Sequence, residues 1–525
     1  MNLNLNLNLL VLPPNRLKWV LALAIAIAAW LLYSPTITAD FVWDARAKVL
    51  MSDFILDPSN LPDVLTGRVL TRDVLDNNRP ANLLSLMIDA AFWGRRPAGY
   101  HATSITLHAV VCAMLFLLLV RLLPAPGALC PAFLAALIFA VHPLNCEAVS
   151  EVSYREDLLV AASFMVALFA AIAFLRKPGR LRNLLLGALC CLALLFGVAA
   201  KENGVAGPFV LAGYWLLWRR KDPRLPWAAL LAAASIAVFG FLLARFTLRP
   251  EHSVIFTSPP ARLGGSLANS LLAQVRIWAM QFSQIIFPHD LCADYGPWSI
   301  RNYSVPLSAV ALALVIAAQL FLAFRNRLFA LGSVLFWAGL LPVSNIVPIF
   351  RPMADRFLYV PLLGLAIILS QALYLARNLR LALRVALFCL LILWITAAAF
   401  LTFRREAVWH DSLVLWQDTA VRNPFSFTAA NNLGWAQLAV QHNRDAAASF
   451  ERAIQLSNNS DPDPWAGIAL VCQAIGNPAA ANTAFHRAVS LDPRYAHPQE
   501  LVRALTAEPD VAVKLELLSH PTTNP

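Results

Sequence analysis

Short clusters of ionisable residues stand directly beside long apolar runs in this sequence. Asp40 and Asp44 follow the first such run, with Phe41 and Trp43 between them. A carboxylate at a membrane surface is partly dry, which raises its affinity for protons. Either acid could therefore accept a proton from a hydroxyl nucleophile. The alternative is an interfacial acid that is merely solvated.

Arg79 belongs to a second cluster, Asn78-Arg79-Pro80, after which the chain is apolar as far as Trp93. A guanidinium group can hold a phosphate through two parallel hydrogen bonds, so Arg79 is a candidate ligand for an anionic headgroup. A surface arginine that extends its charge into water is the alternative. The apolar stretch is too short to cross a membrane and predicts a helix on the outer surface.

Further ionisable residues recur between apolar runs, where burying a charge is costly and each charge is a functional candidate. They are His142, Glu147, Arg155 and Asp157, then Lys201 and Glu202, and finally Asp355 and Arg356. An ion-pair network that only holds helices together is the structural alternative. No Walker loop, Rossmann glycine pattern or His-Glu-x-x-His motif is present, which disfavours soluble nucleotide and metalloprotease chemistry.

These sequence motifs assign no metal ligand and require no cofactor. Asp40, Asp44 and Glu147 nevertheless carry the oxygen ligands that hard cations prefer. The sequence is therefore compatible with two alternatives: these acids bind a divalent cation, Mg²⁺ or Mn²⁺, or a carboxylate acts as the base without a metal.

The elements that position these residues must be helices in lipid. Of 525 residues 59% are hydrophobic and only 14% are charged, with a mean hydropathy of +0.62, which is too apolar for a water-soluble chain of this length. About eleven apolar runs are long enough to cross the bilayer as helices. They lie near 17–36, 102–122, 129–144, 157–175, 183–200, 204–218, 226–246, 303–324, 327–345, 356–376 and 382–402.

The net charge of +11 reflects the orientation of the chain in the membrane and does not indicate nucleic-acid binding. Basic residues gather in the short loops between alternate runs, as in 176–180 and 219–221, which places those loops and the N-terminus on the cytoplasmic side. The candidate residues then share the opposite side with two longer loops, 37–101 and 247–301. An odd number of crossings puts the C-terminal region on that side as well.

The composition changes after residue 403 to that of amphipathic helices. Small and large residues repeat with an offset of 35 between Phe450 and Phe485, close to the 34 of tetratricopeptide repeats. We expect two repeats, a preceding half-repeat that contains Trp416, and a cap over 498–519. The predicted fold is all-α: a cytoplasmic tail at 1–16, a transmembrane bundle at 17–402, and a soluble tetratricopeptide-like solenoid at 403–525.

Taken together, the motifs resemble those of the transmembrane and tetratricopeptide-repeat-containing branch of the GT-C glycosyltransferases, which are relatives of the protein O-mannosyltransferases. The resemblance covers nearly the whole chain. It rests on Phe41-Val42-Trp43-Asp44, Arg79-Pro80, Gly99-Tyr100-His101, His142-Pro143, Glu147-Ala148-Val149, Arg155-Glu156-Asp157, Lys201-Glu202-Asn203-Gly204 and Asp355-Arg356-Phe357-Leu358-Tyr359.

This resemblance implies that a sugar, such as mannose, passes from a polyprenyl phosphate to a hydroxyl acceptor on a protein or surface glycan, with inversion. It implies that Asp44 is the base, with Asp40 as a second carboxylate, and that Arg79, Arg356 and Lys201 bind the lipid phosphate. His142, Glu147, Arg155, Asp157 and Glu202 would support the acceptor or the site. One departure is that such enzymes carry two adjacent acids, whereas Asp44 is followed by Ala45.

The departure at Ala45 favours one alternative, a non-catalytic membrane scaffold whose repeats recruit protein partners. A transporter is disfavoured because inverted repeats and broken spans are missing from the sequence. We expect a multi-pass protein of a bacterial inner membrane with a periplasmic repeat domain, or of the endoplasmic reticulum with a lumenal one if the source is eukaryotic.

Overall fold

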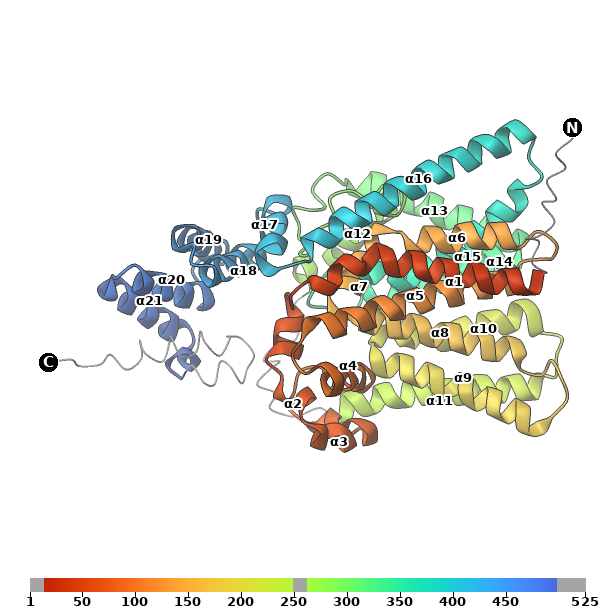
Figure 1. The fold of residues 1–525 in the computed structure, drawn as a ribbon, viewed down its shortest axis with the longest axis horizontal. Helices are drawn as coiled ribbons and strands as arrows, with labels where there is room; N and C mark the ends of the chain where they lie inside the picture. Colours follow the sequence, from red (N-terminus) through yellow and green to blue (C-terminus); the bar gives the residue numbers. More distant parts are fainter. Residues whose placement is uncertain (1–13, 249–261, 498–525) are drawn as a thin grey trace, which may run out of the picture.

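The computed structural model describes residues 14–248 and 262–497, and these residues form helices and loops without a β-strand. They build two parts, a bundle of long helices and a smaller helical domain at one end of it (Figure 1). The expected all-α fold is confirmed.

Each of the eleven predicted spans coincides with a helix. The helices are α1 (Pro14–Tyr33), α5 (Pro97–Leu122), α6 (Leu129–Ala140), α8 (Glu156–Ala173), α9 (Arg180–Ala200), α10 (Gly207–Tyr214), α11 (Arg224–Thr247), α13 (Val305–Arg325), α14 (Arg327–Leu340), α15 (Tyr359–Ala376) and α16 (Leu381–Val408).

The eleven helices are not equally long. Within the described residues eight helical segments are long and apolar enough to cross a membrane, and α6 forms a ninth candidate together with Pro143–Ser150, after a bend of 52°. The other two, α10 and α14, are shorter than a typical span. The protein is a multi-pass membrane protein.

Close backbone contact holds the centre of the bundle together. Gly332 on α14 faces Gly364 on α15, and a Cβ atom on Gly332 would lie 2.6 Å from the carbonyl oxygen of Gly364. Small residues allow helices to approach in this way where lipid provides no hydrophobic force between them. The short helix α14 therefore packs closely against α15.

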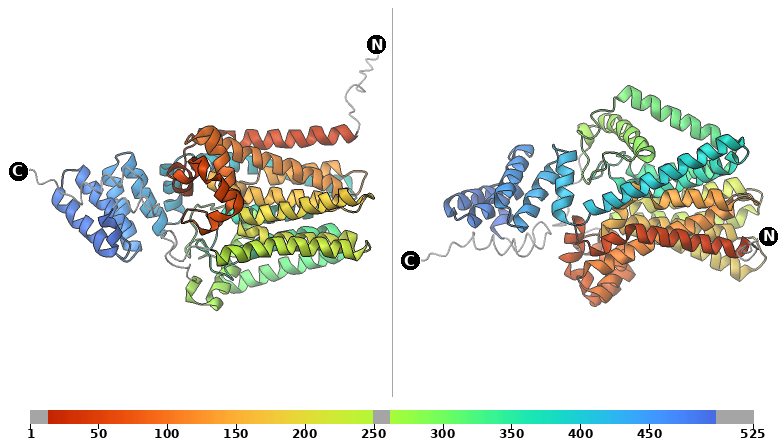
Figure 2. Two further views of the ribbon diagram at one scale, coloured as in Figure 1. Left: turned by 90° about the horizontal axis from the view of Figure 1, so that it is seen from below. Right: turned by 45° about the horizontal axis from the view of Figure 1, so that its top comes forward.

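The two ends of the bundle differ as the charge pattern predicts. The loops that join α5 to α6, α8 to α9, α13 to α14 and α15 to α16 lie at the end away from the C-terminal domain (Figures 1 and 2). The shorter helices α2 (Asp53–Leu56), α3 (Leu61–Thr66) and α4 (Pro80–Trp93) lie at the other end, next to that domain. We refer to this as the outer end; α4 is the short helix expected after Arg79.

The C-terminal domain consists of α17 (Ser412–Arg422) and two antiparallel helix pairs, α18 (Phe427–Ala439) with α19 (Asn443–Leu456) and α20 (Asp463–Ala474) with α21 (Pro478–Leu491). Phe450 is fully buried between α18 and α20, where Cβ atoms on Gly434 and Gly467 would both collide with its ring. The two repeats and the preceding helix thus match the spacing of the sequence. The expected cap at 498–519 lies outside the described residues.

Candidate active site

Asp44 lies in a tight turn that follows the first span. After α1 the chain continues through a 3-10 turn at Ser34–Thr38, and Trp43 adopts a left-handed conformation with φ of 48°. This conformation is unusual for a bulky residue and persists only where surrounding contacts hold it. The Trp43 ring lies between Tyr154 of the bundle and Trp416 of the C-terminal domain, at 6.0 and 5.2 Å between ring centroids.

The Asp44 carboxylate is partly accessible, with 37% of its side chain exposed, which is similar to the 35% of Glu202. Lys48 lies one helical turn later, with its Nζ atom 3.5 Å from Oδ2 of Asp44. Burial alone would raise the pKa of Asp44, but the charge of Lys48, followed by those of Arg356 and Arg351, outweighs burial and keeps this pKa below its usual value. Asp44 is therefore ionised at neutral pH.

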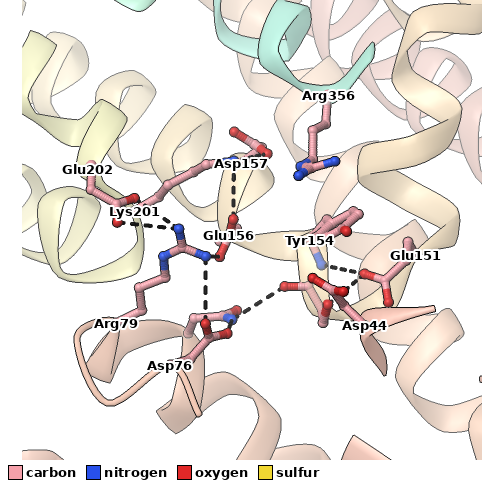
Figure 3. Close-up of polar contacts among 12 residues, drawn as sticks. Asp44, Asp76, Arg79, Glu151, Tyr154, Glu156, Asp157, Lys201, Glu202 and Arg356 are labelled. Carbon is pink, nitrogen blue, oxygen red and sulfur yellow. Dashed lines mark hydrogen bonds and ion pairs between the residues drawn. The ribbon is translucent and has the colours of Figure 1, made fainter. Parts of the chain in front are cut away.

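Lys48 begins a continuous chain of ion pairs across the outer end of the bundle (Figure 3). Its Nζ atom lies 3.2 Å from Asp76, and Asp76 lies 3.6 Å from Arg79. Arg79 then contacts Glu156 at 2.6 Å and Glu202 at 3.1 Å. One guanidinium group thus joins the loop before α4 to the starts of α8 and of the loop after α9.

The chain of ion pairs continues through Glu156. Its second oxygen lies 3.1 Å from Nζ of Lys201, which also pairs with Asp157 at 2.6 Å. Glu202 accepts a further bond of 2.5 Å from Arg245. Burial would raise the pKa of Glu202, but Arg79 and Arg245 outweigh it and hold the pKa far below its usual value. Buried charges are thus compensated throughout the cluster.

Arg356 lies near Asp44 and contributes positive charge there. Its backbone N–H donates to Glu147 at 2.9 Å, and its guanidinium group pairs with the same carboxylate. The guanidinium group also lies over the ring of Tyr154, 3.8 Å from its centroid. Glu147 and Tyr154 thus fix the position of Arg356, and Figure 3 shows Arg356 and Asp44 on either side of Tyr154.

Glu151 is a second carboxylate beside Asp44, and it was not among the predicted site residues. It is fully buried and accepts the backbone N–H of Ala45 at 2.7 Å. It also accepts the Ser153 hydroxyl at 2.7 Å and the Tyr154 N–H at 2.9 Å. Burial, and next the charge of Asp44, raise the pKa of Glu151 to about 8.

Three of the predicted site residues lie apart from this cluster. Asp40 is exposed, and its N–H donates to the carbonyl of His410 at 2.9 Å. His142 bonds to the carbonyl of Ile285 at 3.0 Å, at the end of α12 (Leu267–Ile286).

The third residue, Arg155, is fully buried, pairs with Asp89 and donates to the carbonyl of Tyr100 at 2.8 Å. These contacts tie α4 and α5 to the start of α8, which is a structural role.

The acids named for a possible cation do not converge. Asp44 is paired with Lys48, Glu147 with Arg356, and Asp40 lies against His410. Over 14–248 and 262–497 no three His, Cys, Asp or Glu side chains are arranged to hold a metal ion.

Some of the cluster was within reach of sequence reasoning and some was not. Lys48 stands four residues after Asp44 and Asp76 three before Arg79, which are spacings that place charges together. Glu151 and Arg245 gave no such local signal, because their partners Ala45 and Glu202 are 106 and 43 residues away in the chain.

Fold and site together define a polytopic helical membrane protein with a repeat domain, whose charge cluster at one end of the bundle includes the partly exposed carboxylate of Asp44. Curated relatives match most of the chain. It is 24% identical over 444 residues to "Protein O-mannosyl-transferase F38B6.6" of Caenorhabditis elegans, 25% over 502 residues to "Protein O-mannosyl-transferase TMTC4" of Mus musculus, and 23% over 417 residues to "Protein O-mannosyl-transferase TMTC3" of Homo sapiens. No protein-family model matches the chain.

These matches cover 81%, 84% and 72% of the chain but only 61%, 66% and 43% of the worm, mouse and human relatives. The chain thus spans roughly half of the length of such relatives. The resemblance to transmembrane, repeat-containing protein O-mannosyltransferases, predicted from the motifs, is confirmed.

Proposed function

We propose that this protein is a membrane glycosyltransferase that moves a sugar, such as mannose, from a polyprenyl phosphate to a hydroxyl group of a protein at the outer end of the bundle. The observation that carries the proposal is Asp44, an ionised and accessible carboxylate among Lys48, Arg351 and Arg356. The names of the relatives support the reaction type and a protein acceptor.

In the proposed reaction the acceptor hydroxyl oxygen attacks the anomeric carbon on the face opposite to the phosphate. The bond between that carbon and the phosphate oxygen breaks, the hydroxyl proton passes to Asp44, and the polyprenyl phosphate leaves with the electron pair. A carboxylate with a lowered pKa is a weak base, so proton transfer becomes favourable only as the new C–O bond forms and the hydroxyl becomes acidic. Inversion follows from attack on the opposite face.

The leaving phosphate requires positive charge, and the candidates differ in access. Arg79 keeps 20% of its side chain exposed, against 5% for Lys201 and 9% for Arg356. Among these three cations, Arg79 is therefore the one that a phosphate can reach with the least rearrangement, and it would stabilise the charge that grows on the leaving group. Lys201 and Arg356, which are more buried, would contribute positive charge to the leaving phosphate without direct contact.

We propose that Glu151 takes the place of the second acid that is missing at Ala45. The second carboxylate reaches Asp44 from the loop before α8 and bonds to the N–H of Ala45, instead of following Asp44 in the chain. We propose that Glu151 is a positioning residue that fixes the turn carrying Asp44. The repeat domain would lie on the non-cytoplasmic side, beside the site.

The test is transfer of labelled mannose from synthetic polyprenyl phosphate mannose to a Ser/Thr-rich peptide by purified protein. We expect Asp44→Asn to lower turnover by about 10²–10⁴-fold, because the general base is lost while size and hydrogen bonding are kept. Arg79→Lys should retain part of the activity that Arg79→Ala loses. Asp53→Asn, an exposed outer acid, is the matched control.

A native chain that transfers no sugar from any such donor would instead support a membrane scaffold. Full turnover by Asp44→Asn in folded protein would refute the assignment of the base, and Asp40→Asn would then test the other acid.

A further inference from the structure

A hollow of about 570 Å³ lies at the outer end, apart from the charge cluster. It is bounded by the segment before α13 and by the end of α17 with the loop that follows it. Its size is within the range of ligand-binding pockets. The residues that matter for its chemistry are Trp298, Arg301, Tyr303, Val421 and Arg422.

The walls combine aromatic surface with positive charge. The guanidinium carbon of Arg301 is 3.7 Å from the centroid of the Trp298 ring, and the same ring lies 4.7 Å from Phe425. Arg422 is bound by Asp418 at 2.9 Å, whereas no carboxylate among the described residues forms an ion pair with Arg301. Arg301 is exposed, so its charge is available to a ligand. The acid that lines the hollow, Asp290, is largely solvated.

Hydrogen bonds and an ion pair connect the segment before α13 to the loop after α17 and to the loop that carries Asp44. Asp294, just before Trp298, accepts the Ser426 hydroxyl at 2.5 Å, and its carbonyl accepts the Asn423 side chain at 2.9 Å. Its carboxylate also pairs with Arg351, whose guanidinium carbon lies 5.1 Å from the centroid of the Trp43 ring. Two successive contacts, from Asp294 to Arg351 and from Arg351 to Trp43, thus connect the hollow to the residue that precedes Asp44.

We propose that this hollow binds the acceptor as an extended polypeptide, with an acidic side chain of that segment against Arg301 and an apolar one against Tyr303 and Val421. The inference rests on the proposed function and names the acceptor subsite. A polypeptide fits better than a glycan because Arg301 lies over the Trp298 ring, the surface on which a sugar would otherwise stack. The guanidinium group instead offers a charge-assisted hydrogen bond to a carboxylate.

The experiment measures peptide binding without any sugar donor. The probe is a fluorescent twelve-residue peptide with two threonines, one phenylalanine and flanking aspartates, and its partner carries lysines in place of the aspartates. Fluorescence anisotropy gives the Kd for native protein in detergent, for Arg301→Glu, and for Arg68→Glu, which reverses an exposed arginine elsewhere at the outer end.

We expect native protein to bind the aspartate peptide more tightly than the lysine peptide. Arg301→Glu should raise the Kd for the aspartate peptide by about 10-fold or more, since the loss of a hydrogen bond to a charged group has an effect of that size. Arg68→Glu should bind as native protein does. An unchanged Kd in Arg301→Glu, or no binding of either peptide by native protein, would overturn the inference.

Transfer assays with the same peptides separate this inference from the proposed function. If peptide binding depends on Arg301 but no sugar is transferred, the subsite stands and the proposed function fails. If sugar is transferred with the same KM for peptide in native protein and Arg301→Glu, the function stands and the subsite is wrong.

Discussion

Replacing Glu151 by glutamine should make the stability of the protein less dependent on pH. In the folded protein the pKa of Glu151 rises from an ordinary 4.5 to about 8. Below pH 4.5 the residue is protonated in both the folded and unfolded states, so it has no effect there. Between pH 4.5 and 8 the unfolded chain releases the proton while the folded protein retains it, so the free energy of unfolding falls as pH rises.

The size of this effect follows from the pKa difference. At roughly 1.4 kcal/mol per pKa unit the full loss is on the order of 5 kcal/mol. Glutamine is nearly isosteric with the protonated acid, and its amide oxygen can still accept the N–H of Ala45. Its NH2 group cannot accept the N–H of Tyr154, a loss that does not depend on pH, so the Tm of Glu151→Gln relative to that of native protein should rise steadily from pH 5 to pH 8.5.

The assay is thermal unfolding in detergent, followed by tryptophan fluorescence, at pH 5, 6, 7 and 8.5. The quantity of interest is the difference in Tm between Glu151→Gln and native protein, since other titrating groups cancel in it. Asp44→Asn removes one cause of the raised pKa of Glu151. In this variant the loss of stability with rising pH should therefore end at a lower pH than in native protein. A Tm difference that stays constant across these pH values would refute the reasoning.

Two further predictions concern packing and metal dependence. Gly434→Ala should destabilise the C-terminal domain by about 1–3 kcal/mol, because its Cβ atom would lie 2.7 Å from the buried Phe450 ring. Faster proteolysis of that domain would reveal this, whereas Gly240→Ala, which has open space around it, is the control. EDTA should leave sugar transfer unchanged, since Lys48 and Arg356 already neutralise Asp44 and Glu147. Loss of turnover that Mg²⁺ or Mn²⁺ restores would contradict this.

The sequence was sufficient for the helices and for the end of the bundle at which most candidate residues gather, because apolar length and basic loops are local signals. It was not sufficient for the length of α10 or the bend after α6, since these depend on how each helix packs against its neighbours. The same limit applies to Glu147 and Arg356, both predicted as site residues. Their pairing joins positions 209 residues apart, which no spacing in a single sequence can reveal.

The position of Glu151 bears most directly on the choice between an enzyme and a scaffold. Ala45 in place of a second acid favours the scaffold only if the second carboxylate is truly missing. Glu151 instead bonds to the N–H of Ala45 and carries a pKa raised partly by Asp44, so two acids occupy adjacent space although they are distant in sequence. Burial and the charge of Asp44 raise the pKa of Glu151 to about 8, so a neutral Glu151 lies beside an ionised Asp44 at neutral pH, and two neighbouring acids with pKa values this far apart are typical of functional sites. The geometry around Ala45 therefore favours catalysis, and the transfer assay with Asp44→Asn decides it.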